Sequence, residues 1–138
     1  MTPSFRRACY IVAMDTKIGH TTWAIAEGYI PGWSNGPKPA LESHETCCIL
    51  NASDRDAHVR IHVYYEDRDA VGPYTLTVKA GRTRHLRFNE LDDPEPIAKE
   101  TPFASVISSD VPIVVQHTRL DSRQAENALM STIAFGQG

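Results

Sequence analysis

The sequence predicts an all-β protein, an antiparallel β-sandwich of about eight short strands. The clearest strand, Ala57–Glu66, alternates apolar and polar side chains, which is typical of an antiparallel sheet with one face in water. Short runs of this kind recur along the chain, separated by turns rich in Gly, Pro and Asp. Sustained helical periodicity is scarce, so a sandwich or barrel is favoured over a helical or mixed fold.

Turn chemistry sets the boundaries of the predicted strands. Polar residues 51–56 separate the second strand from the third, Val71-Gly-Pro73 separates the third from the fourth, and Ala80-Gly-Arg82 forms a short hairpin link. The predicted strands are His20–Glu27, His44–Ala52, Ala57–Glu66, Pro73–Lys79, Thr83–Asn89, Phe103–Ile107, Ile113–Leu120 and Asn127–Phe135. The last begins in an Ala-containing stretch, Gln124–Met130, that could instead be helical.

Composition narrows the class of protein. A length of 138 residues favours one domain with a single core. The net charge of −3 argues against binding nucleic acid by bulk charge. No apolar run reaches the roughly 20 residues of a membrane helix and no signal peptide is recognisable, so a cytoplasmic location is expected. Three cysteines do not make a disulfide framework, and Cys47 and Cys48 are expected to be small thiols on opposite faces of a strand.

Two connections between predicted strands are long. Gly28–Ser43 is rich in Pro and Gly and carries Tyr29 and Trp33, whereas Glu90–Pro102 is acidic. Loops of this length are uncommon unless they are functional or disordered. The aromatic residues make the first loop the better functional candidate, and the second is interpreted as a solvated loop.

The segment 111–121 begins as an apolar strand and ends with polar side chains. Because side chains alternate faces along a strand, the face that starts at Val111 continues through His117, Arg119 and Asp121. A core face that turns polar is expected where the core opens into a pocket or an interface. Arg119 could hold a carboxylate or phosphate, and Asp121 could accept hydrogen bonds from sugar hydroxyls. The alternative is that Arg119 pairs with an acidic residue across a strand or subunit boundary.

A second set of candidate ligand-binding residues surrounds the first long loop. Trp23, Glu27 and Tyr29 combine aromatic faces with a carboxylate, a common way to grip a sugar or a cation. The alternative places Trp23 in the core and uses Tyr29 to seal the loop. His44 and Glu45 enter a strand just after this loop, so they could line the same cavity.

Other clusters carry weaker signals. Lys79, Arg82 and Arg87 belong to a basic cluster that could contact nucleic acid, although a solvated edge whose charge prevents aggregation is the favoured interpretation. His58 and His62 lie too far apart on a strand to share a metal ion. No nucleophile–base arrangement, phosphate loop or metal motif is evident, so the sequence predicts a non-enzyme without metal or cofactor.

Four stretches together resemble the sensory rhodopsin transducer family. They are Thr22–Pro31, Ser43–Thr46, Tyr64–Tyr74 and Val111–Asn127, and the resemblance runs from about Ile18 to Gly136. It implies a small cytoplasmic β-sandwich that assembles as a homotetramer and associates with a membrane rhodopsin. It also implies that sugar-like ligands and DNA are candidate partners.

The resemblance divides the chain into residues 1–17 and a single domain over 18–136. The first part is expected to be a disordered extension or a gene-model artefact, because Met14 would be a natural start. For the domain, the sequence predicts an oligomer that binds a small polar ligand and signals through protein contacts. Two alternatives stay open: a pure adaptor of a membrane photoreceptor, and a DNA-binding regulator.

Overall fold

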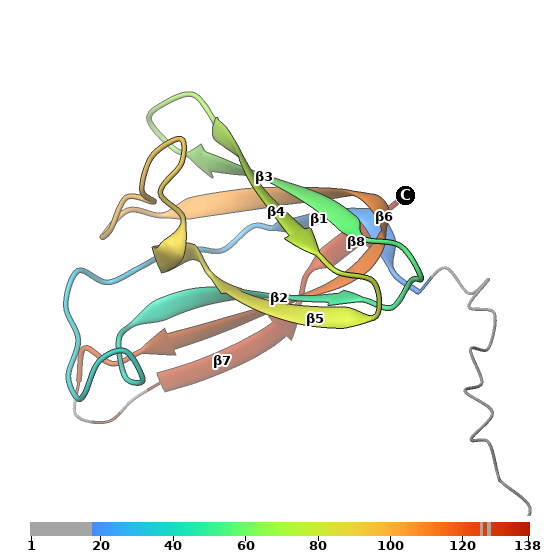
Figure 1. The fold of residues 1–138 in the computed structure, drawn as a ribbon. Coiled ribbons are helices and arrows are strands. Elements are labelled where there is room, and N and C mark those ends of the chain that lie inside the picture. Colours follow the sequence, from blue (N-terminus) through green and yellow to red (C-terminus); the bar gives the residue numbers. More distant parts are fainter. Residues whose placement is uncertain (1–17, 125, 127) are drawn as a thin grey trace, which may run out of the picture.

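A computed structural model describes residues 18–124, 126 and 128–138, and these form eight β-strands and one short 3₁₀ helix (Figure 1). The predicted extension over 1–17 lies outside the described residues. The elements are β1 (His20–Ile25), β2 (His44–Asn51), β3 (Ala57–Tyr65), β4 (Val71–Val78), β5 (Arg82–Arg87), η1 (Phe88–Glu90), β6 (Phe103–Asp121), β7 (Ala128–Ile133) and β8 (Phe135–Gln137).

Every strand pairing in the described residues is antiparallel, and the strands form two layers that share β6. The first layer has the order β4-β3-β6-β1-β8, and the second has the order β5-β2-β6-β7. The first half of β6 pairs with β1 and β3, and its second half pairs with β2 and β7 (Figure 1). The predicted all-β sandwich is therefore confirmed.

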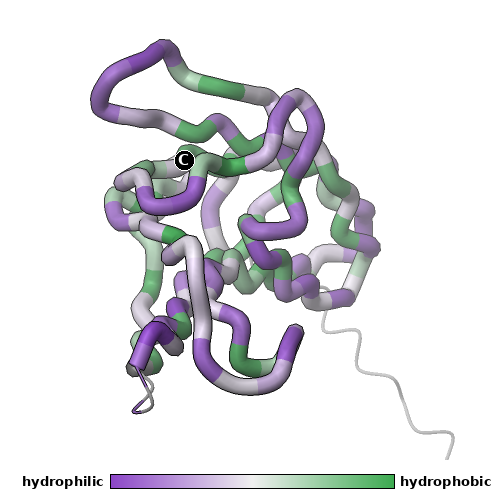
Figure 2. The backbone as a smooth tube through the Cα atoms, turned by 90° about the vertical axis from the view of Figure 1, so that its left-hand side faces the viewer, coloured by the Kyte–Doolittle hydropathy of each residue, from purple (hydrophilic) through white to green (hydrophobic). Residues whose placement is uncertain are grey.

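Alternation along the strands places the core between the two layers. On β3, Val59, Ile61 and Val63 are buried, whereas His58 and Arg60 are exposed. Figure 2 shows hydrophobic and hydrophilic stretches that succeed one another along the chain. Burying one face of each sheet against the other removes apolar surface from water, which is the main favourable contribution to folding.

One prediction about the strands is wrong: Phe103–Ile107 and Ile113–Leu120 are a single 19-residue strand, β6. The strand turns its corner where it leaves β3, and there three extra residues interrupt its register with β1. Trp23 fixes this corner, since its indole N–H donates to the backbone oxygens of His20 and Ile113. Pro112 is tolerated there because proline is compatible with a strand at a bulge, where no ladder N–H is required.

The C-terminal segment is extended, so the helical alternative for Gln124–Met130 is wrong over its described strand residues. The predicted strand Asn127–Phe135 is divided: β7 pairs with β6, and β8 crosses over to pair with β1. Asn127 itself lies outside the described residues. In the described part of the chain, no helix has the length and apolar character needed to cross a membrane.

Candidate functional site

A pocket of about 350 Å³ opens beside the end of β6. Arg119 and Asp121 reach it from β6, while Glu27 and Tyr29 come from the segment after β1. Its lining consists of Glu27, Gly28, Tyr29, Pro31, Pro102, Arg119, Asp121 and Arg123. We call it the Arg119 pocket. The polar end of β6 therefore borders a cavity, at the point where the inward face of the strand leaves the core.

Arg119 is held between two carboxylates. Its Nε donates to Glu45 Oε1 at 2.5 Å, and its Nη2 donates to Glu27 Oε1 at 2.6 Å. Glu45 is fully buried, whereas the side chain of Glu27 is 63% exposed. The buried partner orients the guanidinium, and the exposed partner lies where a ligand can reach it. The interpretation of Arg119 as a partner of an acidic residue across a strand boundary is thus observed, and it coexists with a place in the pocket.

Glu45 is hydrogen-bonded at both carboxylate oxygens although no part of it reaches water. The backbone N–H of Tyr29 donates to Oε1 at 2.9 Å, and the buried ring of His117 pairs with Oε2 through Nε2. Burying a charge is costly unless it is paired and hydrogen-bonded, and Glu45 meets both conditions. Burial opposes the charge of Arg119, but its hydrogen bonds to Glu27 and Glu45 outweigh this and raise the pKa of Arg119.

The far side of the pocket is formed by an ion pair of Asp121 and Arg123. Arg123 donates through Nε and Nη2 to both oxygens of Asp121, at distances from 2.7 to 3.2 Å. This hydrogen bonding lowers the pKa of Asp121. The guanidinium carbon of Arg123 also lies 5.5 Å from the centre of the Tyr29 ring, within the range of a cation–π contact. Asp121 is therefore ionised and fixed in orientation.

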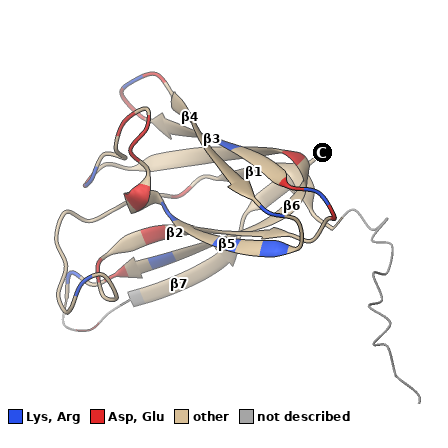
Figure 3. Ribbon diagram, in the orientation of Figure 1, with Lys and Arg blue, Asp and Glu red and all other residues tan. Residues whose placement is uncertain are grey.

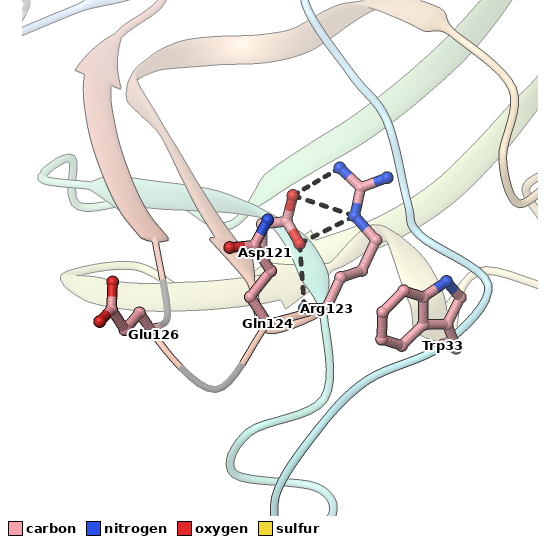
Figure 4. Close-up of a pocket in the computed structure, with 5 residues that line it drawn as sticks. All are labelled: Trp33, Asp121, Arg123, Gln124 and Glu126. Carbon is pink, nitrogen blue, oxygen red and sulfur yellow. Dashed lines mark hydrogen bonds and ion pairs between the residues drawn. The ribbon is translucent and has the colours of Figure 1, made fainter.

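The same ion pair borders a second pocket of about 440 Å³. Trp33, Gln124 and Glu126 line it together with Asp121 and Arg123 (Figure 4). Trp33 is 54% exposed. In Figure 4 its indole lies on the far side of Arg123 from Asp121. The Asp121–Arg123 pair thus lies between two cavities, each with an aromatic side chain at its border.

The chemistry of the Arg119 pocket is that of hydrogen bonding and ring contact. Carboxylates accept, guanidinium groups donate, and Tyr29, Pro31 and Pro102 offer apolar surface. Among the residues that the structure describes, no group of three or more His, Cys, Asp or Glu side chains is arranged to hold a metal ion. The pocket therefore combines hydrogen-bond donors, acceptors and apolar surface.

Comparison with known proteins shows which family the chain belongs to. The family model of the Anabaena sensory rhodopsin transducer matches residues 18–136. The chain belongs to the Anabaena sensory rhodopsin transducer family. A solved structure named "Anabaena sensory rhodopsin transducer" is 66% identical, with a TM-score of 0.68; the match covers 75% of this chain and 98% of that one. A crystal structure of Thermotoga maritima 1070 is 34% identical, with a TM-score of 0.76, covering 87% of this chain and 97% of that one. No curated protein matches the chain.

In this transducer-family domain, the residues predicted from sequence fall into three groups. Four line the Arg119 pocket: Glu27, Tyr29, Arg119 and Asp121. Two lie behind them, Glu45 in contact with Arg119, and His117 in contact with Glu45. The other two lie elsewhere: Trp23 is packed in the core at the corner of β6, and His44 lies on the opposite face of β2 from Glu45.

The basic cluster is partly engaged within the domain. Lys79 Nζ lies 3.1 Å from Asp56, and Arg87 donates to the carbonyl of Pro39 at 2.8 Å. Arg82 is exposed on β5, whose basic residues are blue in Figure 3. These residues do not meet the Arg119 pocket, whose cations come from β6 and the segment that follows it.

Sequence reasoning missed two residues of the transducer-family pockets that a signal could have revealed. Arg123 continues the alternation of His117, Arg119 and Asp121, and extending this face by two residues would have included it. Trp33 was noted as an aromatic residue of the long loop but was not assigned to a site. Pro102 closes the Arg119 pocket from the second long loop and carries no sequence signal of its own.

Proposed function

We propose that the protein is a non-enzymatic, cytoplasmic signal-transduction domain. In this proposal it binds a small polar, sugar-like ligand in the Arg119 pocket and passes the signal on through protein contacts. The observation that carries the proposal is the position of Arg119, which a buried carboxylate holds at the wall of an open pocket. A guanidinium fixed in this way is organised before a ligand arrives, which reduces the entropic cost of binding.

The lining favours a polyhydroxylated ligand over an apolar one. Glu27 and Asp121 present carboxylate oxygens that accept hydrogen bonds from hydroxyl groups, and Arg119 and Arg123 donate to ligand oxygens. Tyr29 supplies an aromatic ring whose face packs against the C–H surface of a sugar. A lining that both donates and accepts hydrogen bonds suits a ligand whose hydroxyl groups do both.

A thermal-shift screen against sugars, sugar acids and polyols tests this proposal. A ligand at about 100 times its dissociation constant stabilises the folded state by roughly 2.7 kcal/mol if it does not bind the unfolded chain. We expect Asp121→Ala to abolish the shift, whereas the exposed matched control Asp54→Ala keeps it. No shift across the panel, or a shift that Asp121→Ala leaves unchanged, would contradict the proposal.

A second candidate function is that of an adaptor for a membrane rhodopsin. It is favoured by the likeness to the protein named "Anabaena sensory rhodopsin transducer", which is 66% identical. Co-purification with a retinal protein from the native host would support the adaptor function. A ligand-induced thermal shift without such a partner would favour ligand binding alone.

Self-association is part of the proposal, and a tetramer is the state we expect. The apolar side chains Leu129, Ile133 and Phe135 on β7 and β8 are between 64% and 71% exposed. Exposed apolar side chains on an edge strand mark an interaction surface. Light scattering that finds a monomer at all concentrations would contradict it, and Ile133→Lys is expected to dissociate the assembly.

DNA binding through Lys79, Arg82 and Arg87 has the least support. All three side chains already have partners in the domain, Arg82 through the carbonyl oxygen of Gly81 at 3.1 Å, and a net charge of −3 does not favour association with a polyanion. A DNA affinity that falls steeply with salt and is weakened by Arg82→Ala would revive this alternative.

A further inference from the structure

A third cavity, of about 360 Å³, opens on the outward face of the second layer, on the other side of β2 from Glu45. We call it the His44 hollow. Its lining is formed by His44, Thr46, Cys48, His85, Arg87 and Thr118, from β2, β5 and β6. None of these six side chains carries a carboxylate. The hollow therefore differs in chemistry from the Arg119 pocket, where Glu27 and Asp121 supply negative charge.

The strand register brings a row of donors together. Thr46 lies directly between Arg87 on β5 and Thr118 on β6, and in the next row Cys48 lies opposite His85. Directly opposed side chains have Cβ atoms about 4.5–5.5 Å apart. One small group in the hollow can therefore contact a guanidinium, two hydroxyls and an imidazole at the same time.

Two of the polar side chains are buried and yet have atoms left free. His44 is 9% exposed and Thr46 is 6% exposed. Within the described part of the chain, His44 Nε2 and Thr46 Oγ1 have no hydrogen-bond partner. Both atoms remain accessible from the hollow. Buried polar groups in native proteins are normally hydrogen-bonded, so these two point to a ligand or solvent in the hollow.

The remaining hydrogen-bonding capacity defines what fits. His44 Nδ1 lies 2.7 Å from the carbonyl oxygen of Glu42, and a carbonyl only accepts, so Nδ1 carries the hydrogen. In the neutral ring Nε2 is then an acceptor, suited to a P–OH group. Arg87 uses Nη1 on the carbonyl of Pro39 and keeps its other N–H groups for an anion.

We propose that the His44 hollow binds a phosphate group, either free phosphate or that of a small phosphomonoester. Arg87 and His85 donate from the open side, Thr46 donates its hydroxyl hydrogen from the floor, and His44 accepts the acidic hydrogen of monohydrogen phosphate. Thr118 borders the site, with its hydroxyl hydrogen directed to Ser131 Oγ at 3.5 Å. This site is independent of the proposed sugar-like ligand, because the two cavities lie on opposite faces of the β2–β6 pair.

NMR titration of the full ¹⁵N-labelled chain with inorganic phosphate tests the proposal. We expect saturable shifts of the Thr46, His85 and Thr118 amides. Arg87→Ala removes a charge-assisted contact and is expected to weaken binding about ten-fold or more, and Thr46→Val about five-fold. Arg84→Ala is the matched control, because Arg84 is exposed on the same strand, faces the other way and is not part of the lining.

The outcomes separate the proposal from simple charge attraction. Equal losses in Arg84→Ala and Arg87→Ala, or full binding by Thr46→Val, would overturn it, since the hollow would then contribute nothing. Should Arg87→Ala fail to fold, the exposed His85→Ala gives the same test. Glycerol 3-phosphate binding more tightly than phosphate would identify an ester as the ligand. Absence of phosphate binding, with or without DNA binding, would overturn the proposal.

Discussion

The two faces of β2 carry polar side chains in opposite states. On the inward face Glu45 and Asn51 are fully buried, and their polar groups are hydrogen-bonded within the domain. On the outward face His44 and Thr46 are nearly as buried, but each keeps a polar atom free beside the His44 hollow. Burial alone therefore does not distinguish structural from functional polar residues in this strand.

Structural and functional polar residues differ in whether all their polar atoms are hydrogen-bonded within the protein. A buried group with all its partners inside the protein stabilises one conformation and offers nothing to a ligand. A buried group with a free donor or acceptor favours any ligand that completes it. Inward substitutions should therefore reduce stability, and outward substitutions should reduce binding while leaving the fold intact.

The largest expected difference lies between the two adjacent cysteines. Burial raises the pKa of the inward thiol of Cys47 from 9.0 to about 12, which lowers its thiolate fraction by roughly a thousand-fold. Cys48 is only partly buried and lines the His44 hollow. We expect iodoacetamide to modify Cys48 in the native protein and to leave Cys47 unmodified, as read from fragment ions in mass spectrometry. Comparable labelling at both positions would contradict the closed inward face.

The next largest effect is expected at Glu45. Glu45→Gln removes the fully buried charge that pairs with half-buried Arg119, and breaking a pair with a buried partner costs about 3 kcal/mol or more. Thr46→Val, one residue along and facing outward, should change the free energy of unfolding by less than about 1 kcal/mol. Urea denaturation of both variants measures the difference. Similar losses would show that the two faces are equally structural.

Glu27→Gln tests whether burial accounts for the loss of stability expected in Glu45→Gln. Glu27 binds the same guanidinium, but its side chain is 63% exposed, so solvent screens the pair. We expect Glu27→Gln to cost less than about 1 kcal/mol, as surface ion pairs do. A loss as large as that of Glu45→Gln would mean that Arg119, and not burial, sets the energy.

A loss of stability between those of Glu45→Gln and Glu27→Gln is expected at Asn51. Its side-chain amide donates to the carbonyls of Arg55 and Val78 at 2.7 and 3.0 Å, and its oxygen accepts from Ser53. Asn51→Ala leaves the buried carbonyl of Val78 and the partly buried carbonyl of Arg55 without this donor, which should cost about 2 kcal/mol. Thermal unfolding followed by circular dichroism checks it, with Leu50→Ser as the outward control. A near-neutral Asn51→Ala would show that water replaces the amide.

Local alternation was enough to predict much of the fold, but not its corners. Val59, Ile61 and Val63 reveal β3 because their burial follows directly from a period of two. The unbroken course of β6 could not be predicted, since Asp110 and Pro112 read locally as a turn. In the fold the Asp110 carboxylate is hydrogen-bonded to the backbone N–H and the ring of His58 on the neighbouring strand. The two residues are more than 50 positions apart in the sequence.

The candidate site, too, could be predicted only in part from the alternation of side chains. Alternation correctly placed His117, Arg119 and Asp121 on one face. It could not show that Glu45 is a buried partner of Arg119, because that pair forms only when β2 lies beside β6. It also grouped His44 with Glu45, although adjacent residues on a strand face opposite ways.

The smallest expected effect concerns Asp121, which is ion-paired within the domain and also lines the Arg119 pocket. Its side chain is 27% exposed, and its hydrogen bonds from Arg123 lower its pKa below the unfolded value. A carboxyl whose pKa is lower in the folded state stabilises the fold above the unfolded pKa, and this contribution is lost as the pH falls through the folded pKa. Asp121→Asn should therefore cost less than about 1 kcal/mol at pH 7, and its difference from wild type should shrink below about pH 4.

Urea denaturation at a series of pH values measures this difference, with Asp54→Asn as an exposed control expected to follow wild type. A gap that widens on acidification has the wrong sign for a lowered pKa and would contradict the assignment. A gap that stays constant would show that Asp121 acts through shape alone. The expected narrowing would place Asp121 among residues that are held in position by an ion pair and remain accessible to a ligand, an arrangement that neither face of β2 provides.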